Sequence, residues 1–315
     1  MKWLTDKTYG CLTSGLTSLN SAALRQAVKS LVVMRTQNVQ FIRIKKMNRK
    51  VRLMIVAMSI TLSGFANQPK EIPELKNVFD KFKVSGSILI YDQNENVYMG
   101  YNLERCNIAF GPASTFKIPN TLIALESGIA SAETVFKWNG EKRKFSDWER
   151  DLTLKEAFKI SSVPVYQEIA RRVGVEKMKY YTQLFNYGNL EITAENIDKF
   201  WLEGNSAITQ YQQIYFLKKL YNLELPVREE FMMQVKEIMQ YEVNGNYTIS
   251  GKTGWAVRQK EDITWFVGYV ETNDHVYFFA TNVTSNENTD VETFGQVRIK
   301  LTKEILNELK IITKK

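Results

Sequence analysis

A serine and a lysine three residues apart can make a nucleophile and its base. Ser114 and Lys117 lie in the segment GPASTFKIPN (111–120), at the start of an apolar helical pattern. This spacing puts both side chains on one helical face. A serine hydroxyl becomes a good nucleophile when a base takes its proton, and a lysine kept neutral by burial can be that base. The segment is therefore a candidate for an activated serine, although Ser-x-x-Lys alone is a weak signal and is more often a capping serine followed by a solvated lysine.

A second polar group lies far downstream, in a strand-like segment. Lys252, Thr253 and Gly254 follow the β-branched and aromatic run of residues 247–250. A cation and a hydroxyl beside a glycine suit a substrate carboxylate lying against a strand edge, and an exposed strand end is the alternative. The surrounding glycines resemble a phosphate-binding loop, but their spacing differs by one residue and a strand rather than a helix follows. We therefore reject nucleotide binding.

Composition narrows the choice of catalytic chemistry. The chain has one histidine and two cysteines, which is too few for a His/Cys metal cluster, and no EF-hand spacing occurs. An all-carboxylate site is not excluded by counting. His275 lies in a strand-like segment, so a Ser-His-Asp triad is disfavoured and a lysine base is preferred. Cys106 is expected to be a small buried residue. We expect no metal.

The net charge of +8 is unevenly distributed along the chain. Residues 1–66 carry eleven basic side chains and one acidic side chain, whereas the rest of the chain carries 31 basic and 33 acidic side chains. The larger part is thus nearly neutral. The overall basicity consequently gives no indication of a nucleic-acid-binding face.

Residues 47–66 have the organisation of a secretory signal peptide. A basic segment (47–52) precedes a mostly apolar run (53–65), and Gly64-Phe65-Ala66 is a small-x-small cleavage site. The apolar run is short for a transmembrane helix, and an uncleaved N-terminal anchor is the alternative. We expect a secreted, periplasmic protein of residues 67–315, in which Cys106 has no intramolecular disulfide partner. Residues 1–46 are an extension of uncertain status, and translation from Met47 would explain them.

Strand patterns at both ends of the chain bracket a helical middle. Strands are expected within residues 84–101 and 247–282, and a closing helix over 291–309. Five helices are expected between them: 152–159, 165–172, 175–185, 209–221 and 227–240. We predict an α/β (α+β) fold in which an antiparallel sheet flanked by terminal helices carries an inserted all-helical subdomain. The sheet region would span 67–110 and 241–315 and the helical region 111–240, with the active site between them.

Four motifs taken together resemble those of one enzyme family. Ser114-Thr115-Phe116-Lys117, Ser161-Ser162-Val163, Tyr187-Gly188-Asn189 and Lys252-Thr253-Gly254 have the order and separations of class D (OXA-type) serine β-lactamases. Flanking segments are also similar, and the resemblance covers roughly residues 70–312. It implies the serine β-lactamase/penicillin-binding-protein-like fold. It also implies hydrolysis of the β-lactam ring of penicillin-type antibiotics, and hence resistance.

The same resemblance implies a role for each motif residue. Ser114 would attack the lactam carbonyl, Lys117 would be carboxylated to N6-carboxylysine and act as general base, and Ser161 would relay the proton to the leaving nitrogen. The backbone N–H groups of Ser114 and Trp255 would form the oxyanion hole. The remaining residues would stabilise the carbamate (Phe116, Val163, Trp201, Leu202), bind substrate (Lys252, Thr253, Gly254, Trp255, Arg298) or form the site wall (Tyr187, Gly188, Asn189). Arg298 by its sequence alone would be a solvated charge on a helix.

Two related functions share this pattern of motifs. A β-lactam sensor or a penicillin-binding transpeptidase would be acylated without turning over. Sensors lie behind several membrane helices, which the sequence lacks, and the short chain and Trp201-Leu202 disfavour a transpeptidase. A family member with negligible activity is a third alternative. We expect small-molecule β-lactam substrates, carbon dioxide or bicarbonate as the only accessory molecule, no nucleic acid, no membrane association after cleavage, and a monomer or homodimer.

Overall fold

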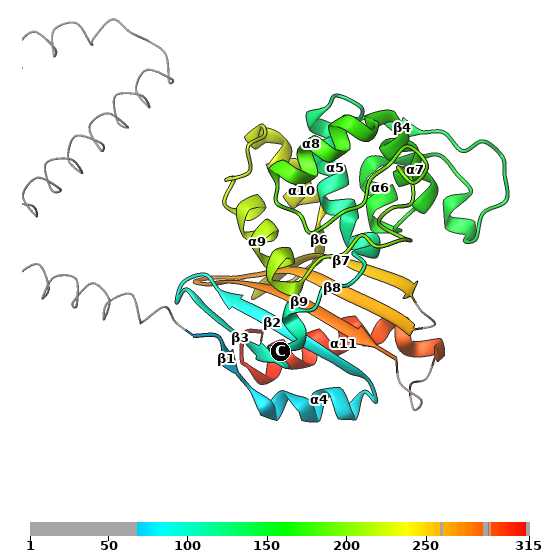
Figure 1. The fold of residues 1–315 in the computed structure, drawn as a ribbon. Coiled ribbons are helices and arrows are strands. Elements are labelled where there is room, and N and C mark those ends of the chain that lie inside the picture. Colours follow the sequence, from blue (N-terminus) through cyan, green and yellow to red (C-terminus); the bar gives the residue numbers. More distant parts are fainter. Residues whose placement is uncertain (1–67, 259–260, 286–288, 290, 313–315) are drawn as a thin grey trace, which may run out of the picture. The chain divides into compact units, whose positions relative to one another are not determined.

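A computed structural model describes residues 68–258, 261–285, 289 and 291–312, which belong to one compact unit, Asn67–Lys315. Their main sheet has the order β1-β3-β2-β9-β8-β7-β6 (Figure 1). Its strands are β1 (Lys70–Glu71), β2 (Ser85–Asp92), β3 (Val97–Tyr101), β6 (Gln240–Val243), β7 (Tyr247–Arg258), β8 (Glu261–Thr272) and β9 (Val276–Thr284). The predicted antiparallel sheet is confirmed, except that the short edge strand β1 pairs with β3 in parallel.

Both faces of the sheet are covered by helices. Side chains alternate along each strand, so one strand contributes to the core on either face. In β2, Leu89 points into one core and its neighbours Ile88 and Ile90 point into the other. Helices α4 (Lys76–Lys81) and α11 (Val291–Glu308) cover the second face, as Figure 1 shows. These two helices come from opposite ends of the described chain, as predicted.

The inserted helical region lies on the opposite face of the sheet (Figure 1). Its α-helices are α5 (Lys117–Glu126), α6 (Leu154–Lys159), α7 (Val163–Val173), α8 (Val175–Leu184), α9 (Gln210–Tyr221) and α10 (Glu229–Ile238). A short hairpin of β4 (Val135–Phe136) and β5 (Leu152–Thr153) is part of the same region. The 3-10 turns of the described chain are η3 (Pro73–Leu75), η4 (Arg105–Asn107), η5 (Ala113–Phe116) and η6 (Ser146–Trp148). Helix α9 packs on β2, β8 and β9 and so joins the helical region to the sheet.

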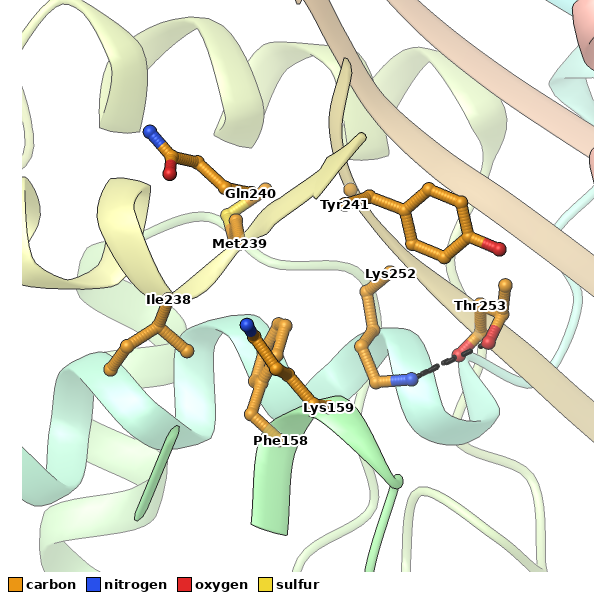
Figure 2. A pocket seen from close by; sticks show the side chains of 9 residues that line it. Phe158, Lys159, Ile238, Met239, Gln240, Tyr241, Lys252 and Thr253 are labelled. Carbon is orange, nitrogen blue, oxygen red and sulfur yellow. Dashed lines mark hydrogen bonds between the residues drawn. The ribbon is translucent and has the colours of Figure 1, made fainter. Parts of the chain in front are cut away.

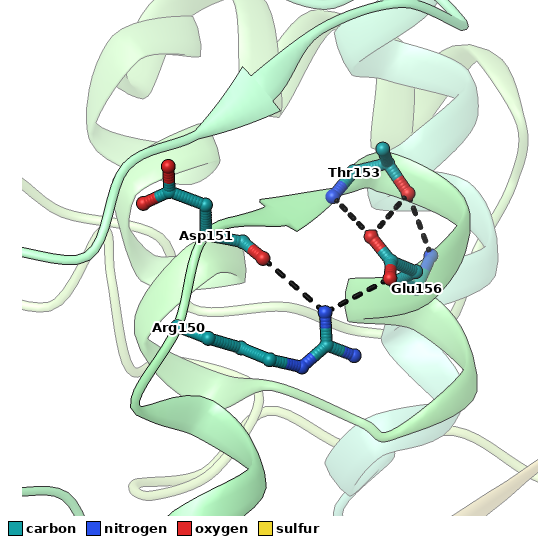
Figure 3. A network of polar contacts seen from close by, with 4 residues as sticks. All are labelled: Arg150, Asp151, Thr153 and Glu156. Atoms are coloured by element: carbon teal, nitrogen blue, oxygen red, sulfur yellow. Dashed lines mark hydrogen bonds and ion pairs between the residues drawn. The ribbon is translucent and has the colours of Figure 1, made fainter.

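The helix predicted over 152–159 starts two residues too early, and the capping of α6 explains why. Residues 152 and 153 form β5, and α6 begins only at Leu154. Thr153 Oγ1 accepts a hydrogen bond from the Glu156 N–H (3.2 Å), and the Glu156 carboxylate accepts one from the Thr153 N–H (2.9 Å). Figure 3 shows this capping box with Arg150 bound to the same carboxylate (2.9 Å). The reciprocal bonds satisfy the first free donors of α6 and set its start.

Two other expectations also need correction at element ends. The helix predicted over 227–240 ends at Ile238, and Gln240 begins the edge strand β6. His275 precedes β9 instead of lying within a strand, and its carbonyl closes the turn with Thr272. No helix of the described residues is long and apolar enough to cross a bilayer. The predicted signal peptide, residues 47–66, and the extension 1–46 lie outside the described residues.

Candidate active site

The predicted nucleophile lies in a tight turn that leads directly into a helix. Ser114 is in η5, and Lys117 is the first residue of α5. The turn is held on both sides, because the Ala113 N–H donates to the Trp201 carbonyl (2.9 Å) and Thr115 Oγ1 donates to the Pro112 carbonyl (2.7 Å). The half-buried Ser114 therefore has a defined backbone position at the start of the helix.

Lys117 has the surroundings that a neutral amine requires. Its Nζ lies 2.9 Å from Ser114 Oγ, and the side chain is fully buried. Burial holds the pKa of Lys117 well below its usual range, and the nearby charge of Lys252 lowers it further. No acidic side chain of the described residues forms an ion pair with it. The amine can therefore accept the proton of the serine hydroxyl.

An aromatic cluster encloses the segment that carries Lys117. Phe116 stacks on Trp201 with ring centroids 5.6 Å apart, and the Tyr166 ring centroid lies 5.0 Å from Lys117 Nζ. Trp201 is fully buried, yet its Nε1 has no hydrogen-bond partner among the described residues. A buried donor without a partner is costly and rare. Trp201 stacks on Phe116, the chain neighbour of Lys117, so an additional acceptor group on the lysine amine would fit this donor.

The other two residues expected around the carbamate, Leu202 and Val163, are half-buried. Leu202 is half-buried and packs against the main core, next to Trp201. Val163 is half-buried and opens α7. The structure thus gives Leu202 and Val163 the partial burial of a site lining, whereas Phe116 and Trp201 belong to the core.

Ser161 lies in the turn between α6 and α7 in an unusual backbone conformation. Its φ is +57°, in the left-handed region that non-glycine residues seldom adopt, and its N–H donates to the Phe158 carbonyl (3.1 Å). Such strain persists where the surrounding structure imposes it, often at functional sites. The Ser161 hydroxyl makes no hydrogen bond to the part of the chain that the structure describes.

The second half of β7 has an edge that pairs with no strand among the described residues, and this edge faces the active site. Strand β6 pairs with β7 only as far as Ser250, and the Gly251 N–H then donates to the Met239 carbonyl (2.8 Å). Because N–H directions alternate along a strand, those of Thr253 and Trp255 point to the same, unpaired side. The backbone donors that the oxyanion hole and a substrate would require therefore lie on an open edge.

Gly254 lies where the turn that carries Ser114 comes close to β7. The sequence suggested that this glycine lets a ligand lie against the strand. In the structure, a Cβ at Gly254 would lie 3.2 Å from the Pro112 carbonyl oxygen and 3.3 Å from Ala113 Cβ. The close approach is thus made by the turn that carries Ser114. Gly254 brings the nucleophile up to the edge of β7.

Lys252 is the second buried lysine of the site. Figure 2 shows it in a pocket of about 240 Å³, where its Nζ donates to the Thr253 carbonyl (3.1 Å) and to Thr253 Oγ1 (3.4 Å). The Phe158 ring lies 5.7 Å from this Nζ, which links the strand to the helix that precedes Ser161. Burial, assisted by the charge of Arg298, lowers the pKa of Lys252 to about 7.

Arg298 on α11 is not the solvated charge that its sequence context suggested. Its Nε and Nη1 are buried and have no partner among the described residues, and its Cζ lies 5.9 Å from the Trp255 ring. Burial lowers the pKa of Arg298 to about 10, so the group stays charged at neutral pH. The Trp255 indole is 41% exposed and donates to Asp262 Oδ1 (2.6 Å). Arg298 therefore offers a charged donor to a bound anion, and Lys252, with a pKa of about 7, offers a second donor that an anion would help to protonate.

Tyr187, assigned with Gly188 and Asn189 to a site wall, lies behind the nucleophile turn. It is buried, and its hydroxyl lies 3.5 Å from Thr115 Oγ1 and donates to Gln213 Oε1 (3.2 Å). Gln213 Nε2 in turn donates to Thr115 Oγ1 (2.9 Å). Tyr187 thus supports the turn from within the core.

Gln213, the partner of Tyr187, is a residue that sequence reasoning missed. The only sequence signal for it is a polar residue on the apolar face of α9. Gly188 adopts a positive φ (+66°), and the exposed Asn189 exchanges backbone hydrogen bonds with Ala207.

The comparisons with known proteins agree with this site. Residues 83–309 match the model of the penicillin binding protein transpeptidase domain, and the chain belongs to that family. Within the family it is a class D β-lactamase, a serine hydrolase that acts on the β-lactam amide bond. Among the described residues, no group of three or more His, Cys, Asp or Glu side chains could hold a metal ion.

Several relatives support this placement. β-Lactamase OXA-48 of Klebsiella pneumoniae is 41% identical over 261 residues, which are 82% of this chain and 96% of the relative. A class D β-lactamase from Nostoc is 43% identical, with a TM-score of 0.72 over 75% of this chain and 98% of that one. A class D β-lactamase from Sebaldella termitidis is 36% identical, with a TM-score of 0.73 over 79% and 100% of the two chains.

Proposed function

We propose that this enzyme hydrolyses the β-lactam ring of penicillin-type antibiotics through an acyl-enzyme on Ser114, and so gives resistance. The observation that carries the proposal is the 2.9 Å contact between Ser114 Oγ and the amine of a fully buried lysine, Lys117. As Oγ attacks the lactam carbonyl, the Lys117 side chain takes the hydroxyl proton. The N–H groups of Ser114 and Trp255 donate to the developing oxyanion. Ser161 relays the proton from the Lys117 side chain to the leaving nitrogen as the lactam C–N bond breaks.

Carboxylation of Lys117 by carbon dioxide is part of the proposal. A neutral amine can add carbon dioxide and release a proton, and the resulting carbamate is a carboxylate-like base for acylation and deacylation. The unpaired Nε1 of Trp201 supports it, because that donor would gain a charged acceptor. Phe116, Val163 and Leu202 would keep water away from this group. No other cofactor is proposed.

Substrate binding is assigned to the cations at the edge of β7. Lys252, Thr253 and Arg298 would hold the substrate carboxylate, which supplies the acceptor that the Arg298 guanidinium lacks. Gly254 and Trp255 place the strand edge along the substrate. Because burial lowers the pKa of Lys252 to about 7, a bound carboxylate would also favour its charged form.

Intact-mass spectrometry tests turnover directly. The purified protein is mixed with excess penicillin and bicarbonate, and a Ser114 adduct should appear and then clear as penicillin is consumed. Ser114→Ala, the control, should show neither adduct nor consumption. An adduct that persists for hours would instead indicate a sensor or a penicillin-binding protein, functions that the similarity to named β-lactamases does not favour.

Export is the second part of the proposal. We infer that residues 47–66 direct secretion to the periplasm and are removed, leaving a monomer or homodimer without membrane attachment. Sequencing the N-terminus of the exported protein should give Asn67 as its first residue. A mature chain that begins before Asn67 contradicts the cleavage site.

A further inference from the structure

A second hollow lies on the far side of the Ser161 motif, and none of the residues assigned to catalysis or substrate binding lines it. It has a volume of about 260 Å³ and is formed by the loop that follows β4 and the first turns of α7. This is just below the usual range of ligand pockets, about 300–1,000 Å³, so it would suit a molecule with a single ring. Three aromatic side chains form its apolar walls: Phe136, Trp138 and Trp148.

The strongest feature of this hollow is the hydroxyl of Ser162. Ser162 lines the hollow and is the N-cap residue of the 11-residue helix α7, but its side chain makes no capping hydrogen bond. The residue is 1% exposed, and its Oγ has no partner among the described residues. A serine at an N-cap normally bonds the helix N–H groups. Here the buried serine hydroxyl has no partner among the described residues, although its residue lines a cavity.

A second donor of the hollow is also unpaired. Arg143 Nε is buried and has no partner among the described residues. The other nitrogens of the guanidinium are fixed, because Nη2 donates to Asn139 Oδ1 (2.7 Å) and Nη1 lies 3.1 Å from a Glu141 carboxylate oxygen. The Arg143 guanidinium is thus held in one orientation, and its Nε–H remains available as a donor. A guanidinium N–H and a serine O–H next to a helix N-terminus together favour an anionic oxygen.

The aromatic walls are fixed in the same way. Trp148 Nε1 donates to the Ile160 carbonyl (3.2 Å), and Trp138 Nε1 donates to the Glu141 carbonyl (2.8 Å). Both indole N–H groups are already hydrogen-bonded within the protein, so the two rings offer a ligand only their apolar surfaces. Four basic side chains line the hollow, and each lies within ion-pair distance of an acid: Lys137, Arg143, Arg150 (Figure 3) and Arg171. The free donors, not excess charge, therefore determine the ligand.

We propose that this hollow is a binding site for a small carboxylate with a planar apolar body, separate from the β-lactam site. The carboxylate accepts hydrogen bonds from Ser162 Oγ and Arg143 Nε, and the ring lies between the aromatic walls. Both contacts satisfy groups that are otherwise buried and unpaired. Because Ser162 directly follows Ser161 in the chain, the ligand contacts the neighbour of a residue assigned to catalysis.

Calorimetric titration of the full-length protein with benzoate tests this site. Wild type should bind one benzoate, and Ser162→Ala should weaken binding about tenfold or more, since a hydrogen bond to a charged group is lost. Ser127→Ala removes a serine hydroxyl from another helix end and should leave the affinity unchanged. Benzamide has the same ring but no charge and should bind at least tenfold more weakly than benzoate. Equal binding of the two would overturn the assignment of an anionic ligand.

The β-lactam site is a competing place for benzoate, because it too offers unpaired cationic donors. Arg298→Gln separates the two sites: it should leave benzoate binding intact, and Trp138→Ala at the hollow should weaken it. Loss of binding in Arg298→Gln together with unchanged binding in Ser162→Ala would place benzoate in the β-lactam site and refute the proposal. No binding to wild type would mean that water alone fills the hollow, which also refutes it. Both results are independent of β-lactam turnover.

Discussion

The indole N–H of Trp201, which has no partner in the described part of the chain, permits a quantitative test of lysine carboxylation. Trp201→Phe removes Nε1 and keeps an aromatic ring against Phe116. A hydrogen bond to a charged group contributes about 1.5–3 kcal/mol. The bicarbonate concentration that gives half-maximal activity should therefore rise about 10- to 100-fold in the variant. The maximal rate should be largely restored at saturating bicarbonate.

The assay is a steady-state rate of penicillin hydrolysis in degassed buffer, measured over a bicarbonate titration. The free energy of unfolding, measured in parallel, gives a readout that does not depend on activity. Bicarbonate should stabilise wild type by mass action, and Trp201→Phe should need a higher concentration for the same gain. The two titrations should give the same shift.

Trp265 provides the matched control for this experiment. It is also a fully buried tryptophan, but its Nε1 already donates to the Gly111 carbonyl (2.9 Å). Trp265→Phe should lower stability, because it leaves a buried carbonyl unpaired, and should not change the bicarbonate dependence. If Trp201→Phe and wild type reach half-maximal activity at the same bicarbonate concentration, the indole does not hold a carbamate and the reasoning is refuted.

Three further perturbations test other parts of the site. Lys117→Ala should acylate slowly and deacylate hardly at all, so intact-mass spectra should show a long-lived adduct. Rapid loss of the adduct would show that Lys117 is not the base. Because burial lowers the pKa of Lys252 from 10.5 to about 7, the folded protein binds fewer protons than the unfolded chain between these values. Unfolding free energy should rise with pH in this window by up to about 1.4 kcal/mol per unit, and denaturant titrations should show that Lys252→Gln removes this contribution. Gly254→Ala should displace the Ser114 turn by a few tenths of an ångström and lower kcat at least about tenfold while the protein stays folded. An unchanged kcat would show that the turn can accommodate the extra methyl group without loss of geometry.

Local signals in the sequence predicted most of the fold and the reactive pair. The spacing of Ser114 and Lys117 predicted that they share a face, because helical geometry is fixed by the backbone. Strand and helix patterns located the sheet, its covering helices and the inserted region. Element ends were harder, since Thr153 reads equally well as a helical residue and as the cap that starts the helix. The capping box with Glu156 determines the choice, and it is visible as a Thr-x-x-Glu spacing.

Residues that act through distant contacts were not predictable in the same way. Gln213 reaches the Ser114 turn from α9, 98 positions away along the chain, and no local pattern indicates that contact. Arg298 lies on a helix whose sequence is amphipathic and charged, so its burial against β7 depends on how α11 crosses the sheet. The likeness to class D motifs identified Arg298 where periodicity could not. Tyr187 was located by a motif, but only the structure showed that it lies in the core behind the Ser114 turn.

The two buried lysines of the site affect one another through their charges. The charge of Lys252 lowers the pKa of Lys117, and thereby favours the neutral amine that carboxylation requires. A carboxylated Lys117 is an anion near Lys252, so it favours the protonated form of that lysine. In the proposed mechanism, the protonated Lys252 is the form that would bind a substrate carboxylate. If Lys117 is carboxylated as proposed, formation of the base and binding of the substrate are coupled, and each should strengthen the other.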